Sequence, residues 1–179
     1  MAREPEAYGN PELVGSGVTS LHSHAGGGTD FEPFKVYDAT GNQEINETEA
    51  TVNLDAIEIA NANYSLASDE ITIVAAGTYL ISLSIAIEQL DTSGGTRSMS
   101  NYWMESDDGG SYAEIVGSFI AIYGRETCID EHGGNNTTFL FAQANASKKL
   151  RVRAVQPNAS GTNIDTMANR SSVSIIRVV

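Results

Sequence analysis

The residues best suited to chemistry in this sequence are two histidines near the N-terminus. His22 and His24 occupy alternate positions of the stretch LHSHAGGG, which ends in three glycines. Because successive side chains of an extended chain point to opposite sides, positions i and i+2 face the same way, and the two imidazoles can bind one transition metal together. The alternative is a polar, solvent-exposed loop whose histidines contact water.

Other reactive side chains do not assemble into a catalytic pattern. A cupin-type metal site needs a glutamate soon after its His-x-His pair, whereas the first glutamate after His24 is Glu32. The later histidine of such a site has no counterpart either, because His132 lies in the loop sequence DEHGGNN. Cys128 and His132 are close in sequence, but no third group or oxyanion motif accompanies them. Acid pairs such as Asp107-Asp108 fall at expected turns, where solvated charges are the usual role and a surface calcium site is the alternative. We therefore expect no enzymatic activity.

The composition argues against nucleic acid and membranes as partners of this protein. The 179-residue chain has 23 acidic and 10 basic residues, and its formal net charge of -13 repels a phosphate backbone, so we expect no nucleic-acid partner. The single Cys128 cannot form an internal disulfide. No segment has the apolar length of a signal peptide or a membrane span, so we expect a chain made in a cytoplasm, with no membrane partner.

The chain divides into two regions of different character. Residues 1–50 hold three of the four prolines, many glycines and only scattered apolar residues, so this region cannot bury enough apolar area to offset its ordering entropy alone. We interpret it as an extended N-terminal arm, with a short strand or a docked segment at 31–41. Residues 51–179 form the expected domain.

From residue 51 onward the pattern is a series of strands. Within 79–87, large apolar residues alternate with Ser82, Ser84 and Ala86, which predicts a central strand that is closely covered on both faces. A change of phase near Ala56 predicts a bulge or kink, and Asp107-Asp108-Gly109-Gly110 predicts a hairpin turn. No long amphipathic helix is evident. The prediction is an all-β, antiparallel jelly-roll sandwich.

Four stretches resemble a known jelly-roll family. AAGTYLISLSIAI, at 75–87, resembles the central strand of tumour necrosis factor and of the complement globular heads. NANYSLASDEITI is similar to the hairpin that precedes this strand, TTFLFAQANASKKLRVRAV to the paired late strands, and SSVSIIRVV to the closing strand. The resemblance covers roughly residues 50–179.

This resemblance implies a compact homotrimer around a three-fold axis. It makes Tyr79 and the strand Phe139-Leu140-Phe141 candidates for the trimer interface, with packing inside their own sandwich as the alternative role. In a trimer, the pairs formed by His22 and His24 would bring six imidazole nitrogens to the axis. Six nitrogens suit an octahedral Fe, Ni or Zn ion, which is the one cofactor that we consider.

The opening residues carry a second resemblance. GVTSLHSHAGGG, at 17–28, resembles the short His-x-His leader that precedes a trimeric jelly roll in bacteriophage virion proteins. It implies a structural protein of the virion surface, made in the host cytoplasm. Because the chain has one arm and one head but no shaft, we expect a capsid decoration or head-surface protein whose partner is the major capsid protein or another virion protein. The candidate capsid-anchoring residues of the arm, which would otherwise pack under their own jelly roll, are Tyr8, Leu13, Val14, Leu21, Phe31 and Phe34.

The alternative function is a receptor-binding tip of a tail fibre or spike that recognises a host surface glycan or protein. Such a tip needs aromatic residues in exposed loops. Tyr102, Trp103 and Tyr112 lie near the expected turn at 107–110 and are the candidates. Trp103 falls within an expected strand, so we expect it to be buried in the core.

Overall fold

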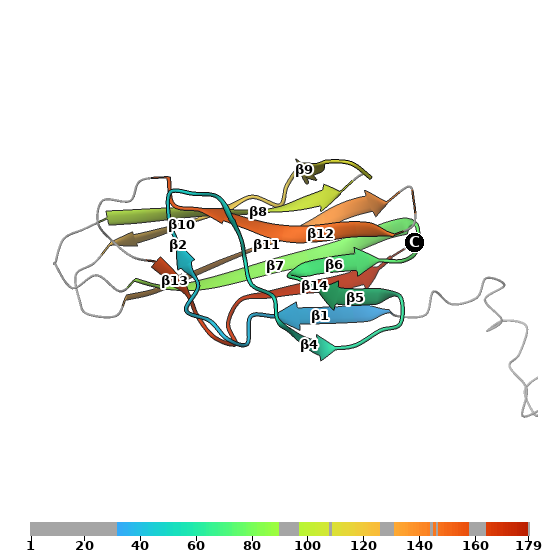
Figure 1. Ribbon diagram of the computed structural model, residues 1–179, viewed down its shortest axis with the longest axis horizontal. Coiled ribbons are helices and arrows are strands. Elements are labelled where there is room, and N and C mark those ends of the chain that lie inside the picture. Colours follow the sequence, from blue (N-terminus) through green and yellow to red (C-terminus); the bar gives the residue numbers. More distant parts are fainter. Residues whose placement is uncertain are drawn as a thin grey trace, which may run out of the picture. The chain divides into compact units, whose positions relative to one another are not determined.

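The computed structural model describes residues 32–89, 97–107, 109–125, 131–143, 145, 147–157 and 164–178. All regular secondary structure in these residues is β-strand, and the strands pair antiparallel in two sheets, A and B, that face each other (Figure 1). The predicted all-β antiparallel sandwich is confirmed.

Sheet A has seven strands, arranged around one long central strand. They are β1 (Pro33–Tyr37), β2 (Glu44–Ile45), β4 (Ala56–Ile59), β7 (Gly77–Gln89), β11 (Glu131–Gln143), β13 (Ile164–Thr166) and β14 (Ser172–Arg177).

Sheet B also has seven strands, and β8 and β12 form its centre. They are β3 (Ala50–Thr51), β5 (Tyr64–Ala67), β6 (Glu70–Ile73), β8 (Arg97–Asp107), β9 (Tyr112–Glu114), β10 (Ile120–Arg125) and β12 (Lys148–Val155).

Strand β7 organises sheet A because both of its edges are paired. On one edge, β11 pairs with every residue of β7 from 77 to 89. The other edge is shared, with β14 opposite residues 79–84 and β13 opposite residues 87–89. Beyond β14 the sheet continues through β1 to β4, which ends it on that side (Figure 1).

The core between the sheets is built from alternate residues of the strands. Along β7 the inward side chains are all buried, beginning with Tyr79 and ending with Gln89. Phe34 stacks on Tyr64 with ring centroids 4.9 Å apart, and Tyr64 meets Tyr79 edge-on at 6.3 Å. The Tyr79 hydroxyl donates to the carbonyl oxygen of Ala75 at 2.7 Å, so this buried polar group is satisfied.

The character of the core changes along β7. Near Tyr79 it is aromatic, whereas at the far end the buried side chains of Gln89 and Ser98 bond to each other at 3.2 Å. Gly133 of β11 lies opposite Ile87 at that end, and a Cβ on Gly133 would come within 3.1 Å of Ile122 Cγ2. The core is therefore aromatic at one end of β7 and combines isoleucines with buried polar side chains at the other.

The compact unit begins earlier than the sequence predicts. The sequence places the end of the arm at residue 50, but contacts separate Met1–Asp30 from Phe31–Val179. Residues 33–51 supply β1, β2 and β3. The physical reason is local, because Phe34 and Val36 alternate with Lys35 and Tyr37, which is enough for a strand that buries two side chains against β14.

The predicted irregularity near Ala56 lies in β4. Lys35 is opposite Ile59 and Val36 is opposite Ile57, so Glu58 is an extra residue in the pairing with β1. The bulge leaves the Glu58 carboxylate 2.7 Å from the Lys35 ammonium.

We predict that Phe34→Ala lowers the free energy of unfolding by about 3–5 kcal/mol, because it empties a buried site and removes the stacking on Tyr64. Denaturant unfolding at a fixed protein concentration measures this change. The control is Val74→Ala, which trims an exposed side chain and should change the value by no more than about 0.5 kcal/mol. If Phe34→Ala lowered the free energy of unfolding by no more than the Val74→Ala control does, Phe34 would not belong to the core.

Candidate interaction surface

The outer face of sheet A is the surface that turns away from sheet B. Because directly paired residues of neighbouring antiparallel strands lie on the same face, the register groups their side chains into rows that cross the sheet. On β7 the outward residues alternate with the buried ones and are half-buried. No described residue of the chain covers this face as a second layer, although the small residues of β7 predict close covering.

An apolar row crosses the outer face near the start of β7. Leu80 pairs with Ile176 of β14 on one side and with Leu140 of β11 on the other, and Ile176 pairs in turn with Pro33. The Leu140 side chain is 64% exposed. Four apolar side chains from four strands therefore form one band that is open to solvent in the single chain.

Two rows of small polar residues follow. Ser82 lies between Ser174 and Thr138, and the hydroxyls of Ser82 and Thr138 are 2.9 Å apart. In the next row Ser84 lies between Ser172 and Asn136. Across β11, β7 and β14 these two rows carry no long side chain, and on β1 they end at Lys35 and Tyr37.

The far end of the face is acidic. Glu44, Asp165 and Glu88 are consecutive partners across β2, β13 and β7, and His132 of β11 is the partner of Glu88 on the other side. Partial burial raises the pKa of Asp165, and the nearby charges of Glu44 and Glu88 raise it further. The outer face of sheet A is therefore graded, from apolar through small and polar to acidic.

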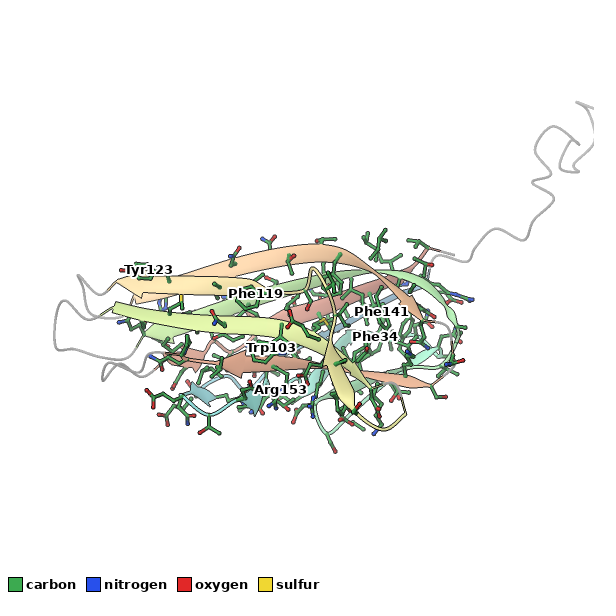
Figure 2. All side chains as sticks on the ribbon, turned by 90° about the horizontal axis from the view of Figure 1, so that it is seen from above. Phe34, Trp103, Phe119, Tyr123, Phe141 and Arg153 are labelled. Atoms are coloured by element: carbon green, nitrogen blue, oxygen red, sulfur yellow. The ribbon has the colours of Figure 1, made fainter. Side chains whose placement is uncertain are left out.

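A second exposed apolar surface lies at the neighbouring edge of the sandwich, where β10 of sheet B meets β11 of sheet A. Phe119 and Tyr123, on this edge, are 50% and 59% exposed (Figure 2). The edge is closed by side chains, because the Asn135 amide donates to the Ala121 carbonyl at 3.1 Å and the Thr137 hydroxyl to the Gly117 carbonyl at 3.2 Å. Exposed apolar side chains gathered on an edge in this way are typical of a surface that contacts a protein.

The outer face of sheet B differs because its charges are paired. The Arg151 guanidinium lies 2.7 Å from the Glu105 carboxylate and 3.6 Å above the centre of the Tyr112 ring. Arg153 contacts Glu49 at 3.2 Å. These ion pairs form a ladder on the solvent-exposed face of sheet B, and in it Arg151 and Arg153 already have acidic partners.

The aromatic candidates for receptor binding belong mainly to this ladder. Tyr112 lies under Arg151 and donates its hydroxyl to Glu70. Trp103 is half-exposed on the outer face and donates its indole N–H to Glu105 at 3.3 Å. The expected core burial of Trp103 is therefore wrong, because Tyr102 and Met104 occupy the two inward positions that flank it.

The remaining predicted site residues divide into two groups. Tyr79, Phe139 and Phe141 are buried in the sandwich of their own chain, and so is Phe34, so all four have the packing role that was the alternative for each. Figure 2 labels Phe34 and Phe141. The others lie outside the described residues: His22, His24, Tyr8, Leu13, Val14, Leu21 and Phe31.

Two findings concern only the described part of the chain. No three side chains of His, Cys, Asp or Glu gather there in a way that could hold a metal ion. None of its segments is a helix of the length and hydrophobicity that crossing a bilayer requires.

The sequence analysis missed Phe119 as a surface residue, whereas Leu140 belongs to the Phe139-Leu140-Phe141 strand that it considered for the trimer interface. A signal for Leu140 is present, since it lies between two inward phenylalanines and must point the other way. Phe119 offers no such signal, because it precedes β10 in a loop.

Comparison with known proteins identifies the fold. No known protein family matches the sequence, and no curated protein does. Among solved structures, Eiger TNF from S. frugiperda matches with a TM-score of 0.57 at 12% identity, over 83% of this chain and 93% of that one. Murine APRIL matches with TM-scores of 0.52 at pH 5.0 and 0.53 at pH 8.0, with 7% and 6% identity, over 83% of this chain and 99% of each of those. The chain therefore has the TNF-like jelly-roll fold that its sequence resembles.

We predict that Glu70→Gln makes unfolding less sensitive to acid. Hydrogen bonds from Tyr112 and then Lys149 hold the pKa of the Glu70 carboxyl below its usual 4.5. A lowered pKa stabilises the fold fully above about pH 4.5, and this contribution is lost as the pH falls through the folded-state value. The variant should be less stable than the wild type at pH 7, and the two should converge in acid.

The free energy of unfolding, measured by denaturant titration from neutral to acidic pH, tests this. Glu114→Gln is the control, because it removes the same charge from an exposed position on the adjacent β9. It should follow the wild-type pH curve. An unchanged acid slope for Glu70→Gln would mean that the bonds to Tyr112 and Lys149 contribute nothing to stability.

Proposed function

We propose that this chain is a structural, non-enzymatic protein of a bacteriophage virion. It acts as a homotrimeric capsid decoration or head-surface protein, made in the host cytoplasm and displayed on the particle. The N-terminal arm docks on the major capsid protein or a neighbouring virion protein, and the jelly roll projects. Docking in this way stabilises or adorns the shell.

The observation that carries the self-association is the uncovered outer face of sheet A. Its apolar row, formed by Leu140, Leu80 and Ile176, crosses one end of the face, and Phe119 and Tyr123 are exposed on the edge where β10 meets the first half of β11. These are two different surfaces on one subunit. When a surface of one copy packs on a different surface of the next, the contacts close into a ring if the rotation allows it, and a three-fold ring is the arrangement that the family resemblance implies.

The virion assignment is supported by the leader sequence and by the composition. Only 18% of residues are charged, so much of the surface is neutral and polar, and the net charge of -13 opposes binding to nucleic acid. Tyr8, Leu13 and Leu21 are apolar residues in an arm that cannot bury them by itself. In a trimer three such arms engage together, so each weak contact with the shell gains from the other two.

We predict that the full-length protein sediments at three times its chain mass of 19.0 kDa and that Leu140→Asp shifts it to the single-chain mass. The substitution places a charge in the middle of the apolar row, where burial against a second copy would strip its hydration. Val74→Asp is the matched control, because Val74 is also exposed but lies outside the outer face of sheet A, and this variant should keep the wild-type mass. A single-chain mass for the wild type would overturn the trimer.

We also predict that electron microscopy of purified particles, with an antibody against residues 51–179, places the label at symmetric positions over the head. Deleting residues 1–30 should remove the protein from particles while its jelly roll still folds, because the compact unit begins after Asp30. Label confined to the tail or its fibres would instead support the receptor-binding alternative. Particles without label would contradict any role in the virion.

A further inference from the structure

A pocket lies at the opposite side of sheet A from β11, where β1, β4 and the turn before β14 meet. Its volume is about 370 Å³, and it is lined by Lys35, Tyr37, Glu58, Asn169, Arg170 and Ser172. Tyr37 and Ser172 are direct partners in the β1–β14 pairing, so they lie side by side. The bulge in β4 supplies Glu58, and the turn supplies Asn169 and Arg170.

The turn that carries Arg170 is held in place by the backbone around Asp38. The Asn169 N–H donates to the Asp38 carbonyl at 2.6 Å, and the Asp38 N–H donates to the Ser171 carbonyl at 3.0 Å. The buried Asp38 carboxylate accepts from the Gly41 N–H and the Thr166 hydroxyl, each at 2.6 Å. This wall of the pocket is therefore formed before any ligand binds, which lowers the entropic cost of binding.

The two basic side chains of the pocket differ in whether they have an ion-pair partner. Lys35 is neutralised by Glu58 at 2.7 Å. Arg170, by contrast, makes no ion pair with any described residue, whereas Arg151, Arg153 and Arg177 all do. A guanidinium that lines a pocket and has no ion-pair partner among the described residues, in a chain of net charge -13, favours an anionic ligand.

We propose that this pocket binds an acidic saccharide, meaning a sugar ring that carries one carboxylate, such as a uronate. The Arg170 guanidinium pairs with the carboxylate through two parallel N–H donors. Asn169 and Ser172 offer donors and acceptors for ring hydroxyls, and the Tyr37 ring offers an apolar surface to the C–H face of the sugar.

Glu58 makes the choice of ligand more specific. Its carboxylate can accept a hydrogen bond from a sugar hydroxyl, but it repels a compact, multiply charged anion such as inorganic phosphate. A ligand that uses every group in the pocket therefore has one negative charge and several hydroxyls. This binding activity goes beyond the proposed structural role, and the pocket lies on the outer face of sheet A at its β1–β4 side, away from Leu140 of β11.

The test is an NMR titration of the full-length protein with glucuronate, glucose and acetate. These probes carry the ring with the carboxylate, the ring alone and the carboxylate alone. We expect glucuronate to bind most tightly and to shift the backbone amides of residues 35–37 and 169–172. Arg170→Gln should weaken that binding about tenfold or more, as expected for the loss of a hydrogen-bonded charge pair.

Two further variants make the result decisive. Lys149→Gln removes the same charge from sheet B and should leave glucuronate binding unchanged. Glu58→Gln frees Lys35 from its ion pair and should therefore improve the binding of inorganic phosphate more than the binding of glucuronate. Since Arg170 is exposed, its substitution should leave the thermal unfolding midpoint unchanged. Equal affinities for acetate and glucuronate, full binding by Arg170→Gln, or no shifts at these residues would each overturn the proposal, and none of these results would bear on the trimer.

Discussion

The structure depends on the pairing of one strand along both of its edges. β7 has thirteen residues, and every one of them faces β11, while β13 and β14 divide its other edge between them. Because side chains alternate strictly along a strand, a shift of one residue would send the buried row to solvent and the serines into the core. The register of β7 therefore determines both the composition of the core and the rows on the outer face of sheet A.

The fold was largely predictable from the sequence, because alternation is a local property. The β7 pattern and the jelly-roll resemblance are both visible in 75–87 alone, and the bulge near Ala56 is visible as a change of phase. The arm boundary was not, because two inward residues in β1 are too few to distinguish a strand from an extended segment. Trp103 shows the same limit, since alternation separates it from Tyr102 but cannot say which of the two faces the core.

The candidate sites were less predictable, because they join distant parts of the chain. Glu58 and Arg170 are more than a hundred residues apart, and only the pairing of β1 with both β4 and β14 brings them to one pocket. The apolar row likewise takes Leu80 from β7, Leu140 from β11 and Ile176 from β14. Each of these residues looks ordinary in its own segment, and its role follows from the sheet order.

The graded core has a consequence for motion. Tyr79 and Gln89 are ten residues apart on one strand, so the two ends of this core lie about 33 Å from each other. Opening the sandwich at Tyr79 exposes the rings of Tyr79, Tyr64 and Phe34 to water, whereas opening it at Gln89 exposes fewer rings and, beside Ile87 and Ile164, an amide and a serine hydroxyl that water can hydrate. Because the free energy of local opening follows the apolar area exposed, amide hydrogens should exchange faster beside Gln89 than beside Tyr79. The sandwich thus opens less readily beside Tyr79 than beside Gln89. A partner that needs the two sheets to separate would meet the lower free-energy barrier at the Gln89 end.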